Sequence, residues 1–108
     1  MEQVSPQEAH RLIEDEHVTV IDCRENYEWE EMRIEGVRLV PLSEYEGEPG
    51  KVERHDKVIF QCAGGQRSQA AAEIYEQEHP GAVALNLDGG IAAWAANGFP
   101  IQVGPPTT

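Results

Sequence analysis

Basic side chains are scarce in this sequence: eight lysines and arginines stand against 20 aspartates and glutamates, a formal net charge of −12 at pH 7. A surface that binds nucleic acid needs clustered cations to contact phosphates, so the charge balance argues against a nucleic-acid partner. It also disfavours an anionic membrane surface as a partner. An acidic excess is typical of a protein that stays soluble because its copies repel one another.

Long apolar runs are absent as well. No stretch approaches the roughly 20 apolar residues of a membrane-spanning helix. Residues 1–5 show neither the basic nor the apolar region of a signal peptide. The two cysteines, Cys23 and Cys62, are too few for a disulfide framework. We therefore expect a cytoplasmic protein in which both thiols are reduced.

Strand and helix signals alternate along the chain, whose length fits one compact domain. Short apolar runs bounded by charged segments predict strands over 18–21, 37–41, 57–61 and 83–87. Apolar residues at helical spacing predict helices over 6–16, 26–32, 66–78 and 91–96. This alternation predicts an α/β fold, a small doubly wound parallel sheet of four to five strands with helices on both faces. We place the domain at 1–103 and a flexible tail at 104–108.

Two predicted helices carry start signals. Ser5 can cap the first helix, Pro6 fits its first position, and Glu8 completes a capping box. Asn26 can cap the second helix. Charges and a Pro-Gly pair over 43–56 predict a helical turn followed by a loop.

Cys62 ends the strand predicted over 57–61, and Gly64 and Gly65 follow it before a helix opens. Glycines let backbone amides turn toward one point, and the first turn of a helix leaves its amides unpaired. Such a nest, together with the helix dipole, stabilises a thiolate and lowers the pKa of Cys62. Ligands of open α/β sheets bind beyond the carboxyl ends of the strands, which is where Cys62 stands.

The loop also carries side chains suited to sulfur chemistry. Arg67 supplies a planar positive charge for an oxyanion, and Ser68 can donate a hydrogen bond to the sulfur or cap the helix. The plainer interpretation is that Cys62 is a small buried residue in a tight turn. Cys, paired Gly, Arg and Ser at one strand-to-helix junction favour the functional interpretation. The predicted substrate-binding residues are Ala63, Gly64, Gly65, Gln66, Arg67 and Ser68.

The spacing of Cys62, four residues, Arg67 and Ser68 resembles the active-site loop of the rhodanese family. Further segments from about Val4 to Pro100 resemble family motifs in the same order. Residues 21–24 resemble an Asp-x-Arg strand end. Residues 28–29 and 34–36 resemble a Glu-aromatic and His-Ile-Pro-Gly region, and residues 87–94 resemble a Gly-Gly-x-x-x-Trp helix.

The resemblance implies a persulfide mechanism without a metal or organic cofactor. The Cys62 thiolate takes the outer sulfur of a donor anion such as thiosulfate, and a thiol or cyanide acceptor removes it. The expected partners are this small anion and a thiol acceptor, with a sulfur-acceptor protein as a further option. Asp22 and Arg24 are expected to form a structural pair or to anchor loops below the active site, and direct catalysis by them is disfavoured.

Some positions depart from the family pattern. Ala63 stands where many members have Arg or another polar side chain, so Arg67 is the only cation of the loop. A sulfur-relay or partner-binding module with low thiosulfate activity is therefore an alternative. The acidic run over 44–53 could select a basic partner. Met32-Arg33 and Glu35 replace the usual Gly-His and Pro.

Other candidates receive plainer interpretations. Related phosphatases have five residues between Cys and Arg, so the shorter spacing disfavours a phosphatase or arsenate reductase. Cys23 is interpreted as a packed residue, although a resolving or relay role stays open. The four histidines show no ligand spacing, and we expect them at the surface and predict no metal site. Trp29 and Trp94 are expected to pack in the core.

Overall fold

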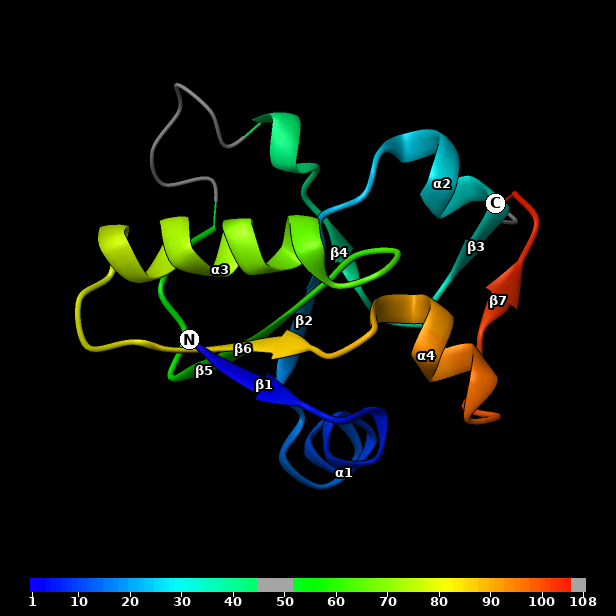
Figure 1. The fold of residues 1–108 in the computed structure, drawn as a ribbon, viewed down its shortest axis with the longest axis horizontal. Helices are drawn as coiled ribbons and strands as arrows, with labels where there is room; N and C mark the ends of the chain where they lie inside the picture. Colours follow the sequence, from blue (N-terminus) through cyan, green and yellow to red (C-terminus); the bar gives the residue numbers. More distant parts are fainter. Residues whose placement is uncertain (45–51, 106–108) are drawn as a thin grey trace.

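A five-stranded parallel sheet forms the centre of the protein (Figure 1). The computed structural model describes residues 1–44 and 52–105. The strands of the sheet are β1 (Glu2–Val4), β2 (Thr19–Asp22), β4 (Arg38–Leu39), β5 (Lys57–Gln61) and β6 (Val83–Leu87). They lie in the order β1-β6-β5-β2-β4, and every pair is parallel. The predicted α/β fold is therefore confirmed.

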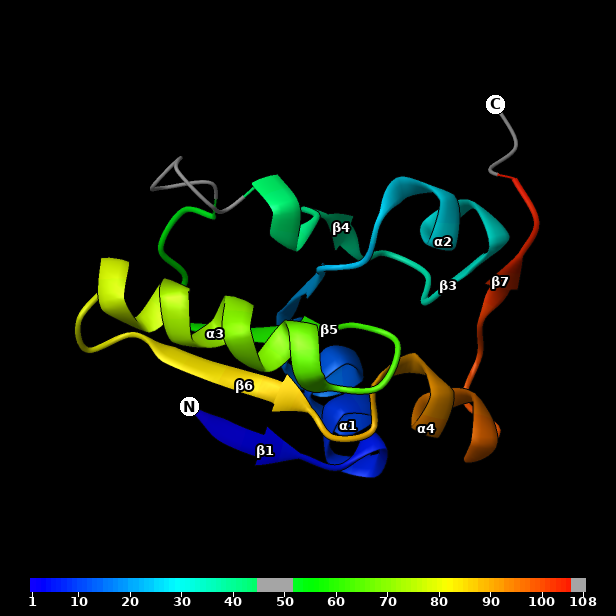
Figure 2. The same cartoon turned by 45° about the horizontal axis from the view of Figure 1, so that its top comes forward.

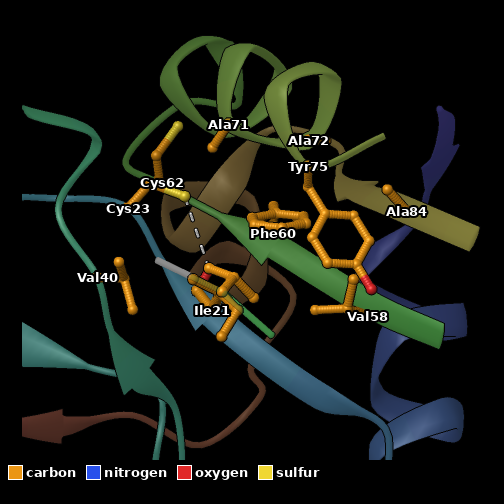
Figure 3. Packing of buried hydrophobic residues seen from close by; sticks show 11 residues of the cluster. Ile21, Cys23, Val40, Val58, Phe60, Cys62, Ala71, Ala72, Tyr75 and Ala84 are labelled. Carbon is orange, nitrogen blue, oxygen red and sulfur yellow. Dashed lines mark hydrogen bonds between the residues drawn. The ribbon is translucent and has the colours of Figure 1, made fainter. Parts of the chain in front are cut away.

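Helices cover both faces of this sheet (Figure 1). They are α1 (Pro6–Glu16), α2 (Asn26–Glu31), α3 (Gln66–Glu78) and α4 (Gly90–Ala96). On the α3 face, the rings of Phe60 and Tyr75 lie 5.4 Å apart (Figure 3). On the opposite face, Ile59 shares a cluster with Leu12 of α1 and Trp94 of α4. Continuous apolar runs such as β5 are what a strand needs when both of its faces are covered.

Three short strands were not predicted. One is β1, a polar edge strand in which only Val4 is buried and pairs with Leu87. The others are β3 (Met32–Arg33) and β7 (Gln102–Val103), which form a separate antiparallel pair. None of these three strands lies in an apolar run long enough to be recognised, whereas the two-residue β4 lies within the strand predicted over 37–41.

Two predicted helix starts need correction. Ser5 caps α1, since its hydroxyl accepts from the Glu8 amide at 3.1 Å, but the Glu8 carboxylate binds Arg11 and completes no capping box there. The cap of α2 is Glu25 and not Asn26. Glu25 and Glu28 form the capping box, because the extended backbone of Glu25 brings both carboxylates within reach of backbone amides.

The structure describes only part of the predicted loop over 43–56 and of the predicted tail over 104–108. The helical turn predicted after residue 43 is a 3₁₀ turn, Leu42–Glu44, and residues 45–51 of the predicted loop and acidic run lie outside the described residues. Residues 106–108 of the predicted tail also lie outside them. Gly104 is held in place, since it donates to the Glu31 carbonyl at 2.9 Å and accepts from Arg33 at 2.8 Å. The longest described helix, α3, has 13 residues, and no helix among these residues could cross a membrane.

Candidate active site at the carboxyl end of the sheet

Cys62 follows β5 directly and lies below α3 (Figure 3). Its side chain is buried, with 1% of the residue exposed. The Gly65 amide donates to the sulfur at 3.0 Å, and the Ser68 hydroxyl oxygen lies 3.2 Å from it. The structure thus brings Cys62, Gly65 and Ser68 of the predicted site together at one point. Of the other predicted loop residues, Gly64 and Gln66 are exposed and Ala63 is half-buried.

The start of α4 holds the loop from beneath. Its amides of Ile91 and Ala92 donate to the carbonyls of Cys62 and Ala63, at 2.8 and 3.2 Å. Gly90 has a positive φ of 62°, and a Cβ added there would overlap both carbonyl oxygens. Both ribbon views show the loop beside the start of α4 (Figures 1 and 2). Gly90, in the Gly89-Gly90 pair, thus has a structural role that the sequence pattern alone did not explain.

Two opposing effects determine the pKa of Cys62. Burial of the sulfur raises it, since the charged form loses solvation. Hydrogen bonds from the Ser68 hydroxyl and from the amides of Ser68, Gly65 and Gly64 lower it. The hydrogen bonds outweigh burial, so the pKa of Cys62 lies below its ordinary value. The loop therefore favours the thiolate, which is the nucleophilic form of cysteine.

Arg67 is paired with an acidic side chain that the sequence analysis did not connect to it. Its guanidinium binds the Glu28 carboxylate in bidentate fashion, at 2.6 and 2.9 Å. This hydrogen-bonded pairing lowers the pKa of Glu28 to about 2 and raises that of Arg67. Glu28 is also held by the Glu25 amide at 3.1 Å. The cation predicted for an oxyanion is consequently neutralised in this structure.

Asp22 and Arg24 form a buried ion pair at the carboxyl end of β2. They are 0% and 3% exposed, and Arg24 Nη2 lies 2.9 Å from Asp22 Oδ2. Arg24 Nε contacts both carboxylate oxygens, and Nη2 also donates to the Met32 carbonyl at 2.6 Å. The pair ties the end of β2 to the segment after α2.

Cys23 and Cys62 form no disulfide. The Cys23 sulfur lies 3.9 Å from the Ile21 carbonyl oxygen, whereas the Cys62 sulfur is directed toward the start of α3 (Figure 3). Both residues belong to the apolar cluster on the α3 face.

The structure adds Asn86 of β6 to the site. This side chain is 2% exposed, and its Oδ1 lies 2.5 Å from the Ser68 hydroxyl oxygen. Its Nδ2 donates to the Gly65 carbonyl at 2.9 Å. The sequence offered no signal for Asn86, because a polar residue inside an apolar strand has no motif around it.

Several residues outside the loop differ from their expected places. His10, half-buried, stacks on Phe99 with ring centroids 4.6 Å apart, and His79 lies 2.8 Å from the Val52 carbonyl, so neither is simply a surface residue. Trp94 is buried as predicted, while Trp29 is half-buried beneath the guanidinium of Arg33 at 4.7 Å. Among the described residues, no group of three or more His, Cys, Asp or Glu side chains could hold a metal ion.

Comparison with known proteins decides the family. The model of the rhodanese-like domain matches residues 5–97. The chain belongs to the rhodanese-like domain family. This rhodanese-like protein is similar to a sulfurtransferase of Allochromatium vinosum, with 32% identity over 93 residues and 86% of each chain covered. It is also similar to the crystal structure of a rhodanese-related protein of Thermoplasma volcanium. There the TM-score is 0.82 and the identity 29%, with 94% of this chain and 98% of the other covered.

A longer relative contains the same domain as a part. The tRNA uridine(34) hydroxylase of Chlamydia abortus is 30% identical over 99 residues, which is 84% of this chain but only 30% of the relative. The rhodanese-like domain thus occurs both nearly alone and within larger proteins. Membership of the family and the similarity to a sulfurtransferase support sulfur transfer as the general activity.

Proposed function

We propose that the protein is a sulfurtransferase that carries a sulfane sulfur on Cys62 as a persulfide, in the reducing cytosol. The observation that supports this most directly is the donor set around the sulfur, in which the Gly65 amide lies 3.0 Å from Sγ. In the first half-reaction the Cys62 thiolate attacks the outer sulfur of thiosulfate. The new S–S bond forms as the old one breaks, sulfite leaves with the electron pair, and Cys62–S–S⁻ remains.

The second half-reaction regenerates the thiolate. A cyanide ion or a thiolate acceptor attacks the terminal sulfur, the Cys62 S–S bond breaks, and the electron pair returns to Cys62. Oxidation states balance within the two steps, so no external oxidant or reductant takes part. A covalent intermediate between two substrates predicts ping-pong kinetics. The loop amides are oriented before the reaction and are suited to stabilising the persulfide anion.

The test measures sulfur on the protein directly. The protein is incubated with thiosulfate, its intact mass is recorded, and cyanide is then added. We expect a gain of one sulfur atom that cyanide removes. Cys62→Ser should abolish the gain, while Cys23→Ser, the matched control, should keep it. A gain that survives Cys62→Ser would contradict the proposal.

A second candidate is a sulfur relay that loads from a persulfide donor and turns over thiosulfate slowly. The Arg67–Glu28 ion pair favours it, because no unpaired loop cation is left for a dianion and Ala63 adds none. Its test compares loading of Cys62 by thiosulfate and by a persulfide-loaded protein thiol. Loading by the persulfide alone supports the relay. Hydrolysis of an aryl phosphate without sulfur uptake would exclude both candidates.

A further inference from the structure

The Ser68 hydroxyl stands between two groups that compete for it. Its oxygen lies 2.5 Å from Asn86 Oδ1 and 3.2 Å from Cys62 Sγ, and all three groups are buried. A hydroxyl has one proton to donate and lone pairs with which to accept. It can therefore donate to Asn86 or to the sulfur, but not to both.

The orientation of the Asn86 amide is determined by its other contacts. Nδ2 lies 2.9 Å from the Gly65 carbonyl and 3.0 Å from Gln3 Oε1. The Gly65 carbonyl can only accept, so the amide nitrogen must face it, and Oδ1 must face Ser68. Since Oδ1 can also only accept, two oxygen atoms 2.5 Å apart require the Ser68 proton between them.

The protonation state of Cys62 then decides the direction of the remaining hydrogen bond. In the neutral thiol, the S–H of Cys62 donates to the Ser68 oxygen while Ser68 donates to Asn86. In the thiolate, the amides of Gly64, Gly65 and Ser68 still donate to the sulfur, and the Ser68 hydroxyl can add its own proton only by turning away from Asn86. That turn leaves the lone pairs of Ser68 and Asn86 facing each other across 2.5 Å.

We propose that Asn86 is a positioning residue for Cys62: by accepting the only proton of the Ser68 hydroxyl, it withholds that proton from the sulfur and opposes ionisation of the thiol. The loop amides favour the thiolate, and Asn86 limits how strongly the loop as a whole stabilises it. The sulfur is thereby kept more nucleophilic than a thiolate of very low pKa would be, because nucleophilicity falls with the pKa.

Among the residues that the structure describes, few charged groups on the surrounding elements compete with this effect. On α3 the cation is Arg67, which interacts with Cys62 electrostatically and is paired with Glu28 of α2. At the end of β2, Asp22 and Arg24 neutralise each other in their buried pair. Ser68 and Asn86 are both uncharged. A switch of the Ser68 hydrogen bond from Asn86 to Cys62 therefore changes the pKa of Cys62 without changing the charge of these two side chains.

The experiment measures the pKa of Cys62 from the pH dependence of its alkylation by iodoacetamide, with the modified peptide quantified by mass. Asn86→Ala is made in the native background and in the Ser68→Ala background. With Ser68 present, we expect Asn86→Ala to lower the pKa of Cys62 by about 0.5–1, the worth of one neutral hydrogen bond. Without Ser68, the same substitution should leave the pKa unchanged or raise it, because only the Gly65 contact is lost.

Gln3→Ala is the matched control, since it removes the exposed partner of Asn86 Nδ2 and leaves the Ser68 contact in place. It should not change the pKa of Cys62. An equal shift from Asn86→Ala in both backgrounds, or the same shift from Gln3→Ala, would show that Asn86 acts only by holding the loop and would overturn the proposal. If Asn86→Ala does not fold, Asn86→Leu fills similar space without an acceptor and is measured in the same two backgrounds.

This inference rests on the proposed role of Cys62 but can fail separately from it. The alkylation assay reports ionisation of the thiol without any sulfur donor. If the pKa depends on Ser68 and Asn86 as expected but no persulfide forms, the proposed function fails and the positioning effect stands. If a persulfide forms but the substitutions of Ser68 and Asn86 show no coupling, the proposed function stands and the positioning effect of Asn86 fails.

Discussion

The guanidinium of Arg67 and the carboxylate of Glu28 are 39 residues apart in sequence and form a bidentate ion pair beside the Cys62 loop, at 2.6 and 2.9 Å. Arg67 is 38% exposed and Glu28 18%, so the pair lies at the edge of the site and within reach of solvent. An incoming anion must compete with Glu28 for the only cation of the loop. In the proposed reaction, the pair would therefore influence which sulfur donor reacts with Cys62.

Glu28→Gln should raise the rate of Cys62 persulfide formation from thiosulfate by about three- to tenfold, because it releases the charge of Arg67 toward the substrate. Loading from a neutral sulfur donor should change less. The measurement is the rate of sulfur uptake by intact mass at subsaturating donor. Glu30→Gln is the control, since it removes the same charge from α2 where the partner is Asn26. An equal gain from both variants would indicate a general charge effect.

The same ion pair should make stability depend on pH in a defined window. The pKa of Glu28 is about 2 in the folded protein and near 4.5 when unfolded, so the pair stabilises the fold fully above pH 4.5. That contribution should disappear as the pH falls from 4.5 to 2. Allowing for solvent screening, we expect Glu28→Gln to cost about 1 kcal/mol at pH 7. Urea unfolding of the native protein and of Glu28→Gln is measured at several pH values. The difference between their free energies of unfolding should shrink as the pH falls from 4.5 to 2. A difference that stays constant would contradict the low pKa assigned to Glu28.

Gly90→Ala should abolish persulfide formation and raise the pKa of Cys62 toward that of free cysteine. The added Cβ would overlap the Cys62 and Ala63 carbonyls and displace the loop whose amides face the sulfur. Gly98→Ala is a matched control: its φ of 80° imposes similar backbone strain, but nothing lies within 4 Å of the added Cβ. We expect the control to lose about 1 kcal/mol of stability and to retain sulfur transfer. Equal losses of activity in both variants would argue against the overlap.

Asp22→Asn should destabilise the protein by about 3–5 kcal/mol, because it leaves the Arg24 guanidinium buried without its counter-charge. Urea denaturation at pH 7 provides the measurement. Glu53→Gln, which breaks an exposed pair with Arg38, should have little effect. If Asp22→Asn is tolerated as well as Glu53→Gln, the buried pair does not support the end of β2 as the structure suggests.

Local signals allowed most of the fold to be predicted. The runs that became β2, β5 and β6 are apolar and contiguous, and the helices α1 and α3 carry apolar faces and end signals within their own residues. β1, β3 and β7 could not be predicted, because no apolar run marks them and they form only where tertiary structure brings a neighbouring strand alongside. The cap of α2 was misassigned for a similar reason. Asn26 is the better cap by residue type, but the backbone conformation selected Glu25.

The sequence by itself determined the loop from Cys62 to Ser68, because strand, cysteine, glycines and helix follow one another and the chain has few ways to arrange them. The tertiary structure alone decided what surrounds the sulfur. It brought Glu28 to Arg67 and Asn86 to Ser68, and it brought Gly90 under the loop. These contacts join segments separated by many residues, and they depend on the order of the parallel strands in the sheet. The residues that are expected to tune the reaction therefore become visible only once the sheet is assembled.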